Sequence, residues 1–355
     1  MAQNPTFRAL GLPKFRLCLP SRNWTIFLTV SASFGAAVSY DKWATRRVQA
    51  KWRDRVSHIA LEPLDSSILP RKIGVYIEAP PGDGLRAARE FFLDYVKPVL
   101  TAGALEWEAV EGRKEGDVRW KLADRIRIQR RRDEKGPDAV ESDENAVQFV
   151  RAKNGTKTYP GPAGDLVIGR HTWKEYIRGL HEGWLGPLVA PPSETTKSES
   201  EGSAPRSETQ QEGNETTQES EDKRLKAGRK PSSISPEDYS AASPPQDIPD
   251  PFNPVAIVPY PHLLGIRNTP FRIYRFLTRR YLADEIGGIV AAAVLASRQR
   301  PFREGEIEQV LEKEEWDWWK TAYQPRKEGE EKVWVEDVIV DERIGRRMRT
   351  WESAD

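Results

Sequence analysis

A short turn made of Gly169, Arg170, His171 and Thr172 has the clearest potential for chemistry in this 355-residue chain. It lies between an apolar stretch and an amphipathic helical pattern, in the run GDLVIGRHTWKEYIRGLHEGW. A strand-to-helix corner of this kind presents free backbone N–H groups beside the positive end of the helix dipole, and many proteins bind phosphate there. The Arg-His-Thr set could bind an anion, and His171 could act as a base.

The rest of a phosphoryl-transfer site is missing from this turn. A kinase needs two or three glycines to bring the backbone against phosphate, and an acid to manage magnesium or the hydroxyl proton. Here Arg170 and His171 take the place of glycines, and the first carboxylate, Glu175, is already within the helix. A second turn, residues 80–84, keeps two glycines but adds an aspartate whose charge repels phosphate. We therefore interpret the corner as a degenerate phosphate site, without catalytic residues and without a cofactor.

Other catalytic and metal-binding patterns are absent from the sequence. There is no Gly-x-Ser-x-Gly and no Walker motif, and the single cysteine, Cys18, excludes a disulfide framework and a multi-cysteine metal site. The four histidines have neither His-Glu-x-x-His nor paired-ligand spacing; they are His58, His171, His181 and His262. Lysine plus arginine (55) nearly balances aspartate plus glutamate (54), so no overall field draws the chain to nucleic acid.

The elements around the two turns alternate between strand and helix. Strands are expected over residues 73–79, 105–110 and 165–168. Helices are expected over residues 85–100, 118–128 (with Asp117 as N-cap) and 173–181. This order predicts an α/β fold, a Rossmann-like parallel sheet with helices on its faces. Because the carboxyl ends of parallel strands share one edge, both turns should lie on the same functional rim.

The composition changes sharply in the second half of the chain. Residues 190–251 are Ser, Glu, Thr, Gln and Pro with almost no large apolar side chain, which predicts a disordered acidic insertion. Folding should resume in residues 252–355, a C-terminal α+β part that packs on the α/β domain. Its segment IGGIVAAAVLA is too short for a membrane span and is interpreted as buried core. We also expect an amphipathic helix over 304–323 and strand-like alternation in VWVEDVIV.

The basic and aromatic run FRIYRFLTRRYL, residues 271–282, allows two interpretations. It could be a patch that faces nucleic acid or lipid. The interpretation we favour is a strand and a helix with solvated arginines, because the net charge supplies no supporting field.

A charge-free segment of seventeen residues, 24–40, is typical of a membrane-spanning helix near the lower length limit. Trp24, Tyr40 and Trp43 can lie at the two interfaces, and basic residues follow just outside them. A secretory signal peptide and a buried core helix are the alternatives. The basic run directly after the segment favours an uncleaved anchor over a signal peptide.

Ser31, Gly35 and Ser39 recur every four residues within this segment and share one helix face. Such a stripe of small residues lets another membrane helix approach closely. The preceding segment, residues 1–23, is basic and free of acids, which suits mitochondrial import, but its prolines break any long amphipathic helix. The expected organisation is a basic N-terminal segment (1–23), a transmembrane helix (24–40), a basic stalk (41–69), the α/β domain (70–189), the insertion (190–251) and the C-terminal part (252–355).

Several segments resemble, in one consistent order, the fungal Tim fifty-four family. They are LPSRNWTIF, YDKW, KWRDRVSHIALEPLDSSILPRKIGVYIEAPPGDGL, YVKPVLTAGALEWEAVEG and GDVRWKLADRIR, then VPYPHLLGIRNTPFRIYRFLTRRYLADEIG and WVEDVIVDERIG. This family is the large membrane-anchored subunit of the inner-membrane translocase that inserts mitochondrial carrier proteins. The resemblance implies a single-pass inner-membrane protein with its N-terminus in the matrix, its bulk in the intermembrane space and no enzymatic reaction. Its implied partners are the channel-forming subunit and the small chaperone subunits, which it links while it stabilises the complex.

A more distant resemblance is to the diacylglycerol-kinase-like lipid kinases, including the mitochondrial acylglycerol kinase. They show the same strand, turn and helix, followed by an Ala-Gly-containing link and a second strand. Their nucleotide loop, Gly-Gly-Asp-Gly-Thr, would fall on Gly169 to Thr172, where only the first glycine and the threonine remain. The resemblance implies a lipid-kinase-like fold that has lost its chemistry and become a docking domain. A membrane-tethered lipid kinase of the acylglycerol type is the alternative function.

Overall fold

The structure, a computed structural model, describes most of the expected folded part of the chain. The described residues are 20–65, 67–135, 150–151, 153–157, 159–189, 231–243, 245, 248–263, 265–303, 305, 333–334 and 337–352. The expected N-terminal segment up to residue 19, most of the expected insertion and nearly all of the expected helix over 304–323 lie outside these residues.

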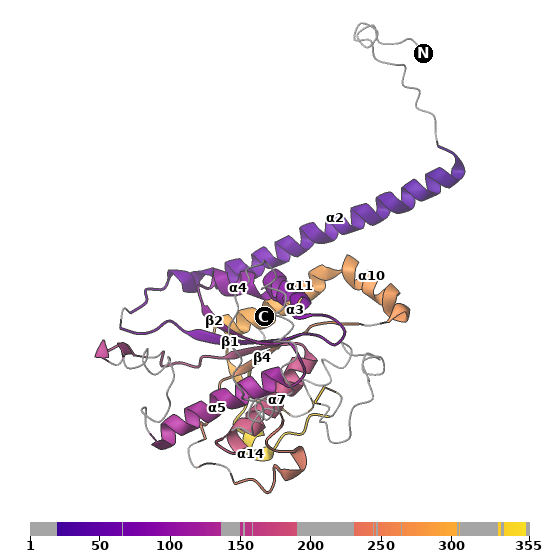
Figure 1. Cartoon of the computed structure of the whole chain (residues 1–355). Helices are drawn as coiled ribbons and strands as arrows, with labels where there is room; N and C mark the ends of the chain where they lie inside the picture. The colour runs from indigo at the N-terminus through magenta and orange to yellow at the C-terminus, as the bar shows by residue number, and fades with distance from the viewer. Residues whose placement is uncertain are drawn as a thin grey trace, which may run out of the picture.

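A sheet of six strands forms the centre of the described part (Figure 1). Its order is β2-β1-β3-β4-β6-β5, and every pairing is parallel except that between β5 and β6. The strands are β1 (Lys72–Glu78), β2 (Glu106–Gly112), β3 (Asp165–Ile168), β4 (Val255–Val258), β5 (Gln299–Pro301) and β6 (Arg349–Trp351). The prediction of an α/β protein with a mostly parallel sheet is therefore confirmed.

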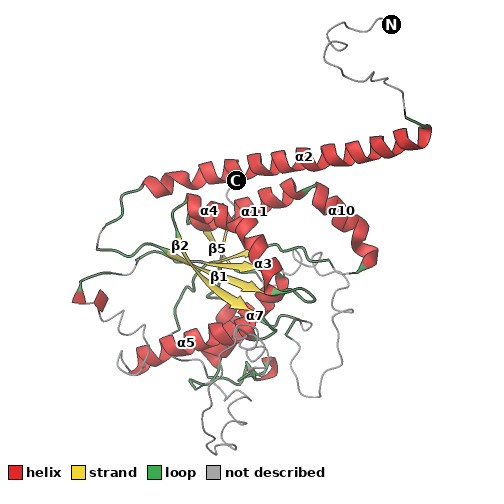
Figure 2. Ribbon diagram, turned by 45° about the horizontal axis from the view of Figure 1, so that its top comes forward, coloured by secondary structure: helices red, strands yellow, loops and turns green. Residues whose placement is uncertain are grey.

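Helices cover both faces of the sheet, so the domain has three layers (Figure 2). One face packs on α3 (Leu85–Phe91), the π-helical segment η2 (Phe92–Val96), α4 (Lys97–Ala102) and α11 (Arg279–Val294). The other face packs on α5 (Asp117–Lys135), α7 (Arg170–Leu185) and the short α14 (Glu342–Gly345). Alternate side chains of β1 enter the two cores, Val75 on the first side and Tyr76 on the second, so the strand is buried on both faces as a central parallel strand should be.

Helices α5 and α7 approach each other closely because α7 carries glycines at the contact. A Cβ on Gly179 would lie 2.9 Å from the carbonyl oxygen of Arg119, and one on Gly183 would lie 2.7 Å from Ile126. Between the helices the carboxylate of Glu182, which is buried, pairs with Arg119 and with Arg127, the latter at 2.9 Å. Removing either partner of such a buried pair leaves an uncompensated charge, which is strongly destabilising.

Helix α2 (Arg22–Val56) is continuous over 35 residues but has two different halves. Its first buried residue is Asp41, and most of the part before it projects from the domain (Figure 1). Its second half packs on α11 and α4, and Trp52 and Val56 enter the first core. Among the helices that the structure describes, none combines the length with the apolar character needed to cross a bilayer.

Two acids join α2 to α11. The Asp41 carboxylate accepts hydrogen bonds from the backbone N–H groups of Arg279 (3.2 Å) and Arg280 (3.4 Å), and so caps the N-terminus of α11. Farther along, the Trp52 indole N–H donates to the carboxylate of Asp284 at 2.7 Å. Segments more than 200 residues apart in the sequence are thereby held side by side.

The segment IGGIVAAAVLA is buried core, as predicted, since most of it forms the buried half of α11. The preceding run differs from the expectation. Instead of a strand followed by a helix, it forms the helix α10 (Thr269–Leu277) and the first turn of α11. Pro270 stands at the first turn of α10, where proline favours a helix because its missing N–H is not needed.

The C-terminal half also contains order that the sequence pattern did not indicate. Ordered structure resumes before Phe252, because Tyr239 and Ile248 are buried in the second core, and the one-turn helices η4 (Pro236–Asp238) and η5 (Ile266–Asn268) lie on either side of β4. Residues 337–340, part of the expected strand-like alternation, are not in a strand, whereas β5 and β6 were not predicted.

Candidate functional site

The two turns singled out in the sequence lie at one edge of the sheet, as predicted. Strand β1 is paired with β2 on one side and β3 on the other, with Tyr76 opposite Val167 and Ile77 opposite Ile168. The chain therefore changes direction across the sheet at β1, and a crevice outside the carboxyl ends of β1 and β3 is where ligands bind in open α/β sheets. Residues 80–84 follow β1, and Gly169 follows β3 at this edge.

Gly169 is required by the backbone at the corner. Its φ is +86°, a left-handed conformation that disfavours any residue with a Cβ, and it precedes the first turn of α7. An added Cβ would lie 2.9 Å from Cε1 of His171 and 3.2 Å from Cβ of Tyr260. The expected strand, glycine turn and helix are all present, and the space above the turn is taken by side chains.

His171 fills this space. It is 4% exposed, and its Nε2 lies 3.3 Å from the carbonyl oxygen of Glu78 at the end of β1. The rings of Trp334 and Tyr260 lie at centroid distances of 5.8 and 6.3 Å. Burial lowers the pKa of His171 to about 4, so the imidazole is neutral at physiological pH and supplies no positive charge for a phosphate.

The other two residues of the corner behave differently from each other. Thr172 is fully buried, and among the described residues its hydroxyl has no hydrogen-bond partner. Arg170 is only partly exposed and makes contacts of its own. The structure thus brings Gly169, Arg170, His171 and Thr172 together at the rim but places two of their side chains inside the protein.

Glu175 was judged from the sequence to lie too far into the helix to serve the corner. In the structure its carboxylate caps the N-terminus of α5. Its carboxylate accepts hydrogen bonds from the backbone N–H groups of Val118 and Arg119, both at 3.1 Å, and from that of Gly116. The indole N–H of Trp334 donates to the same carboxylate at 3.0 Å. The expected N-cap, Asp117, instead accepts from the backbone N–H groups of Arg113 (3.0 Å) and Lys114 (3.1 Å) in the preceding turn.

A second buried carboxyl, that of Glu78, lies beside Glu175. Glu78 is 1% exposed, and neither of its side-chain oxygens has a well-formed hydrogen bond to a described residue. Burial, and after it the negative charge of Glu175, raises its pKa well above the ordinary value, so this carboxyl is held as the neutral acid. The sequence analysis missed this pair; the available signal was a glutamate at the end of an otherwise apolar strand.

The turn after β1 is tied to the segment after β4. The imidazole Nε2 of His262 donates to the carbonyl oxygen of Pro81 at 3.0 Å, and its Nδ1 lies 3.7 Å from the carboxylate of Asp83. Across the described part of the chain, no three His, Cys, Asp or Glu side chains are grouped so that they could hold a metal ion.

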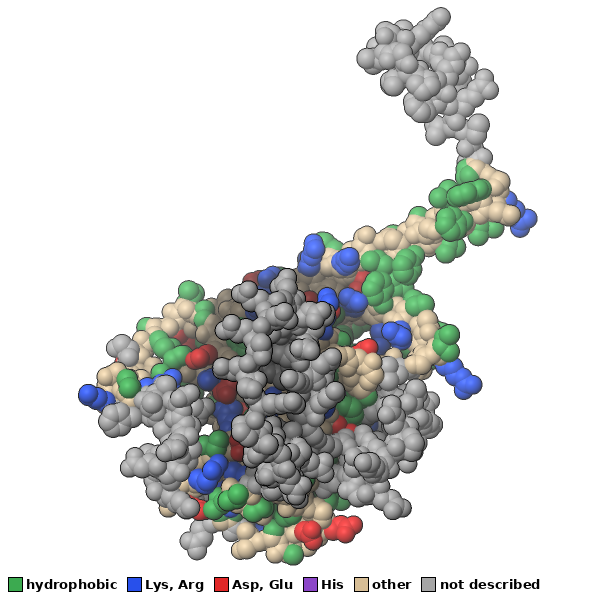
Figure 3. Space-filling model, viewed as in Figure 1, with side chains coloured by type: hydrophobic (Ala, Val, Ile, Leu, Met, Phe, Trp, Pro, Cys, Tyr) green, Lys and Arg blue, Asp and Glu red, His purple; other side chains and the backbone are tan. Residues whose placement is uncertain are grey.

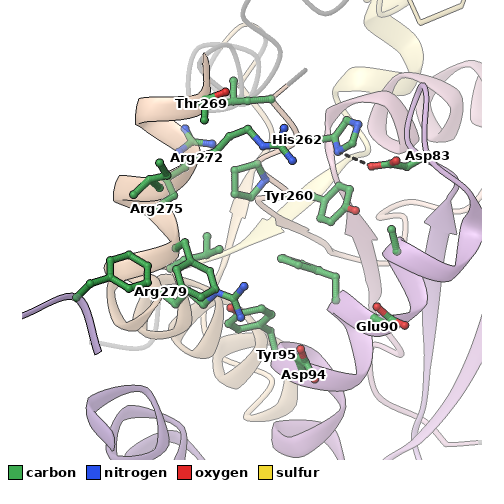
Figure 4. A pocket seen from close by; sticks show the side chains of 18 residues that line it. Asp83, Glu90, Asp94, Tyr95, Tyr260, His262, Thr269, Arg272, Arg275 and Arg279 are labelled. Carbon is green, nitrogen blue, oxygen red and sulfur yellow. Dashed lines mark ion pairs between the residues drawn. The ribbon is translucent and has the colours of Figure 1, made fainter. Parts of the chain in front are cut away.

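An open groove lies beside this rim (Figure 4). Its volume is about 890 Å³, and it separates α3 and η2 from α10 and the start of α11. Acidic side chains of the turn before α3, of α3 and of η2 line one wall, and arginines of α10 and α11 line the opposite wall. The acids are Asp83, Glu90 and Asp94, and the arginines are Arg272, Arg275 and Arg279. Phe34 of α2 also reaches this groove, so it opens beside the projecting helix.

The small residues of α2 lie on the projecting half of the helix. Ser31, Gly35 and Ser39 are all exposed, and a Cβ added to Gly35 would meet no heavy atom within 4 Å.

A family model, that of the inner membrane protein import complex subunit Tim54, matches residues 4–351 of the chain. The chain belongs to the Tim54 family. A relative from Aspergillus oryzae, the mitochondrial import inner membrane translocase subunit tim54, is 43% identical over 96% of this chain and 86% of its own length. The relatives of the same name from Neurospora crassa and Schizosaccharomyces pombe are 43% and 32% identical, over 98% and 95% of this chain and 80% and 94% of their own lengths.

Membership in the Tim54 family confirms the resemblance found in the sequence. It identifies the chain as a non-enzymatic subunit of the mitochondrial inner-membrane import translocase, and the lipid kinase alternative is not supported. The rim is therefore best understood as part of the scaffold of this Tim54 domain.

Proposed function

We propose that this Tim54 chain is a single-pass anchor and assembly subunit of the translocase that inserts carrier proteins. In this proposal residues 24–40 span the inner membrane, the N-terminus lies in the matrix and the α/β domain lies in the intermembrane space. There the domain would link the channel-forming subunit to the small chaperone subunits and stabilise the complex.

The observation that carries the proposal is the division of α2 at Asp41. Residues 24–40 have no charge and no buried side chain, whereas Trp52 and Val56 in the part after Asp41 enter the core. At 1.5 Å per residue the seventeen residues extend about 26 Å, close to the hydrocarbon thickness of a bilayer. A charge-free projecting segment that continues as one helix into a folded domain is the geometry of a membrane tether.

Hydroxyl side chains account for the modest apolar character of this segment, and several of them are already satisfied within the helix. The hydroxyl of Thr29 donates to the carbonyl oxygen of Thr25 at 2.8 Å, and that of Ser33 donates to Val30 at 2.8 Å. Such internal bonds lower the cost of placing Ser and Thr in lipid. A second helix that covers Ser31, Gly35 and Ser39 would lower it further, and we propose the channel-forming subunit as the source of that helix.

We further propose that the domain has a lipid-kinase-like fold without its chemistry. The support is the corner itself, where the neutral His171 occupies the position above Gly169 and the nearby carboxylate of Glu175 is committed to the N-terminus of α5. A phosphate would have to displace a buried ring and approach buried carboxyls. The corner then serves to fasten α5, α7 and β1 to one another.

The test uses a fungus whose own Tim54 is depleted and replaced by this chain. Mitochondria from that strain should insert a labelled carrier precursor into the inner membrane, with a matrix-targeted precursor as the control that does not depend on Tim54. The protein should resist alkaline extraction, and its domain should become accessible to protease only when the outer membrane is opened. Correctly located protein that fails to restore carrier insertion would contradict the proposed function, and extraction at alkaline pH would contradict the anchor.

A further inference from the structure

The outer side of α10 exposes aromatic side chains that a helix of a folded domain normally buries. Phe271 and Tyr274, three residues apart on α10, are 64% and 63% exposed, and Tyr281 in the first turn of α11 is 62% exposed. None of the nine residues of α10 is buried. Helices of soluble domains bury an apolar stripe, and a face such as this marks a surface that contacts something else.

These aromatic residues are continuous with the point where α2 leaves the domain. The Arg280 guanidinium lies over the ring of Tyr281 at 4.5 Å from its centroid and over that of Tyr40 on α2 at 5.5 Å. The same guanidinium pairs with Asp41 at 3.1 Å. Two views place α10 beneath the projecting half of α2 (Figures 1 and 2). The surface thus lies at the level where the proposed anchor ends.

The charge of this surface is positive. Residues 266–283 contain five arginines and no acid: Arg267, Arg272, Arg275, Arg279 and Arg280. Lys42, Arg46 and Arg47 continue the basic character on α2, beside exposed Trp43. Figure 3 shows basic and apolar side chains together along α10 and the projecting half of α2. Exposed Tyr and Trp rings with flanking arginines and lysines are the composition of a membrane interface.

We propose that α10 and the first turn of α11 lie in the headgroup region of an anionic phospholipid bilayer, next to the anchor. Interfacial helices bury their apolar side about 5–10 Å into the boundary between headgroups and acyl chains. Phe34 lines the same groove as α10, and it lies six residue steps, about 9 Å, from Tyr40 along α2, which matches this depth. The domain is then held on the membrane at two places and cannot swing about its tether.

The experiment uses the full chain in vesicles and a fluorophore that brightens in an apolar environment. With Cys18→Ser, the variant Tyr274→Cys carries the fluorophore on α10. Ile339→Cys carries it on an exposed residue three positions before α14, a helix that lies across the sheet from α2 (Figure 1). In vesicles of phosphatidylcholine with phosphatidylglycerol, the label at 274 should brighten, shift to shorter wavelength and be quenched by lipid-borne quenchers. The label at 339 should keep the weak, long-wavelength fluorescence of a fluorophore in water.

The charge contribution is tested by changing two exposed arginines. Each basic residue at an anionic surface strengthens binding roughly fivefold. Arg267→Gln with Arg272→Gln should therefore lower the equilibrium constant for binding of α10 to the headgroup region roughly 25-fold, read from the fluorescence of the label at 274. Arg113→Gln with Arg346→Gln, two exposed arginines elsewhere on the domain, is the matched control and should have no effect. Raising the salt concentration should reproduce the arginine variant.

The proposal for α10 depends on the proposed anchor only because the anchor orients the domain on the membrane. Flotation with the vesicles tests the anchor, and the label at 274 tests α10. Protein that does not float with the vesicles contradicts the anchor. Protein that floats while the label at 274 keeps the signal of water contradicts the inference about α10. The label at 274 could instead brighten only when the other translocase subunits are added, and never in vesicles alone. That result would assign this face to a protein partner and overturn the lipid assignment.

Discussion

The indole of Trp52 on α2 lies directly against Gly287 on α11. A Cβ on Gly287 would be 2.2 Å from Cδ1 and 2.6 Å from Cγ of Trp52, closer than any side-chain carbon can come. Together with the hydrogen bond from Trp52 to Asp284 and the bonds that Asp41 accepts from α11, this contact joins the projecting helix to the body of the domain.

Gly287→Ala should therefore destabilise the domain. The new methyl group forces α2 and α11 apart at a buried contact, which typically costs about 1–3 kcal/mol. The thermal midpoint of the full chain in detergent, followed by tryptophan fluorescence, measures the loss. Gly84→Ala is the control, because its backbone is extended and an added Cβ meets no heavy atom within 4 Å. Equal midpoints for the wild type and Gly287→Ala would contradict the tight packing of α2 on α11.

Glu78→Gln should stabilise the protein at neutral pH. The ordinary pKa of a glutamate is 4.5, and below this pH the Glu78 carboxyl is protonated in both the folded and the unfolded chain. Above it the unfolded chain releases this proton while the folded protein retains it, because burial and the charge of Glu175 raise the folded pKa. The free energy of unfolding therefore falls as the pH rises through this window. The glutamine has no proton to lose, so its advantage should grow from pH 4.5 upward.

The measurement for Glu78→Gln is the melting temperature at a series of pH values. Each kcal/mol of stabilisation corresponds to about 2–4 °C for a domain of this size. Glu90→Gln, on the exposed side of α3, is the control and should not show this growing advantage. A lower melting temperature for Glu78→Gln at pH 7.5 would mean that the carboxyl is ionised and stabilising in the folded protein.

The buried histidines should make the domain sensitive to acid. Burial lowers the pKa values of His171 and His181 to about 4, from 6.5. The unfolded chain binds protons below pH 6.5 while the folded protein does not, so stability is lost as the pH falls from 6.5 toward 4. The loss is about 3 kcal/mol for each histidine. His171→Gln should flatten the dependence in this range, whereas His58→Gln, at an exposed position, should leave it unchanged.

Magnesium-ATP should not stabilise the full chain. A ligand that binds only the folded protein raises stability by about 2.7 kcal/mol at one hundred times its Kd, so even weak binding would raise the melting temperature. An active lipid kinase of the diacylglycerol type, measured in parallel, is the positive control. A rise in melting temperature that disappears when Gly169 is changed to Ala would show that the corner still holds a nucleotide.

Gly35→Leu should loosen the association with the channel-forming subunit. The residue is exposed on the projecting half of α2, and a leucine there would keep a partner helix from close approach without touching the domain. The measurement is the amount of channel subunit that co-purifies from mitochondria in mild detergent, expected to fall several-fold. Ser33→Leu is the matched control, because Ser33 is exposed and lies about 160° around the helix from Gly35, on the opposite side. Equal co-purification of both variants with the channel would remove the proposed interface.

The strands and helices of the first half were predictable because their signals are local. The apolar run of β1 and the amphipathic pattern of α7 depend only on nearby residues, and their alternation already implies a parallel sheet. Strands β5 and β6 were missed because each has three residues and is defined by its partner, with Arg300 opposite Thr350. A segment that short has no periodicity to read.

The position of the rim was predicted from the sequence, but the buried carboxyls that meet there were not. The sequence placed the turn at Gly169 on the rim, yet the nearby acid was judged to be absent from it. Glu175 reaches the rim because it stands in the first part of α7 and α5 begins opposite it, and this relation is set by packing of two helices. Glu78 shows the same limit, because its neighbour comes from α7, far along the chain.

The sequence by itself determined the α/β class, the charge-free segment 24–40, the glycine corner and the resemblance to the Tim54 family, since these depend on residue types and spacing along the chain. Only the tertiary structure decided that the second half of α2 belongs to the core, that Glu78 and Glu175 meet, and that α10 leaves its aromatic side exposed beside the projecting half of α2. The physical reason is that burial is not a property of one segment. It is set by partners such as α11, which folds against α2 from more than 200 residues away.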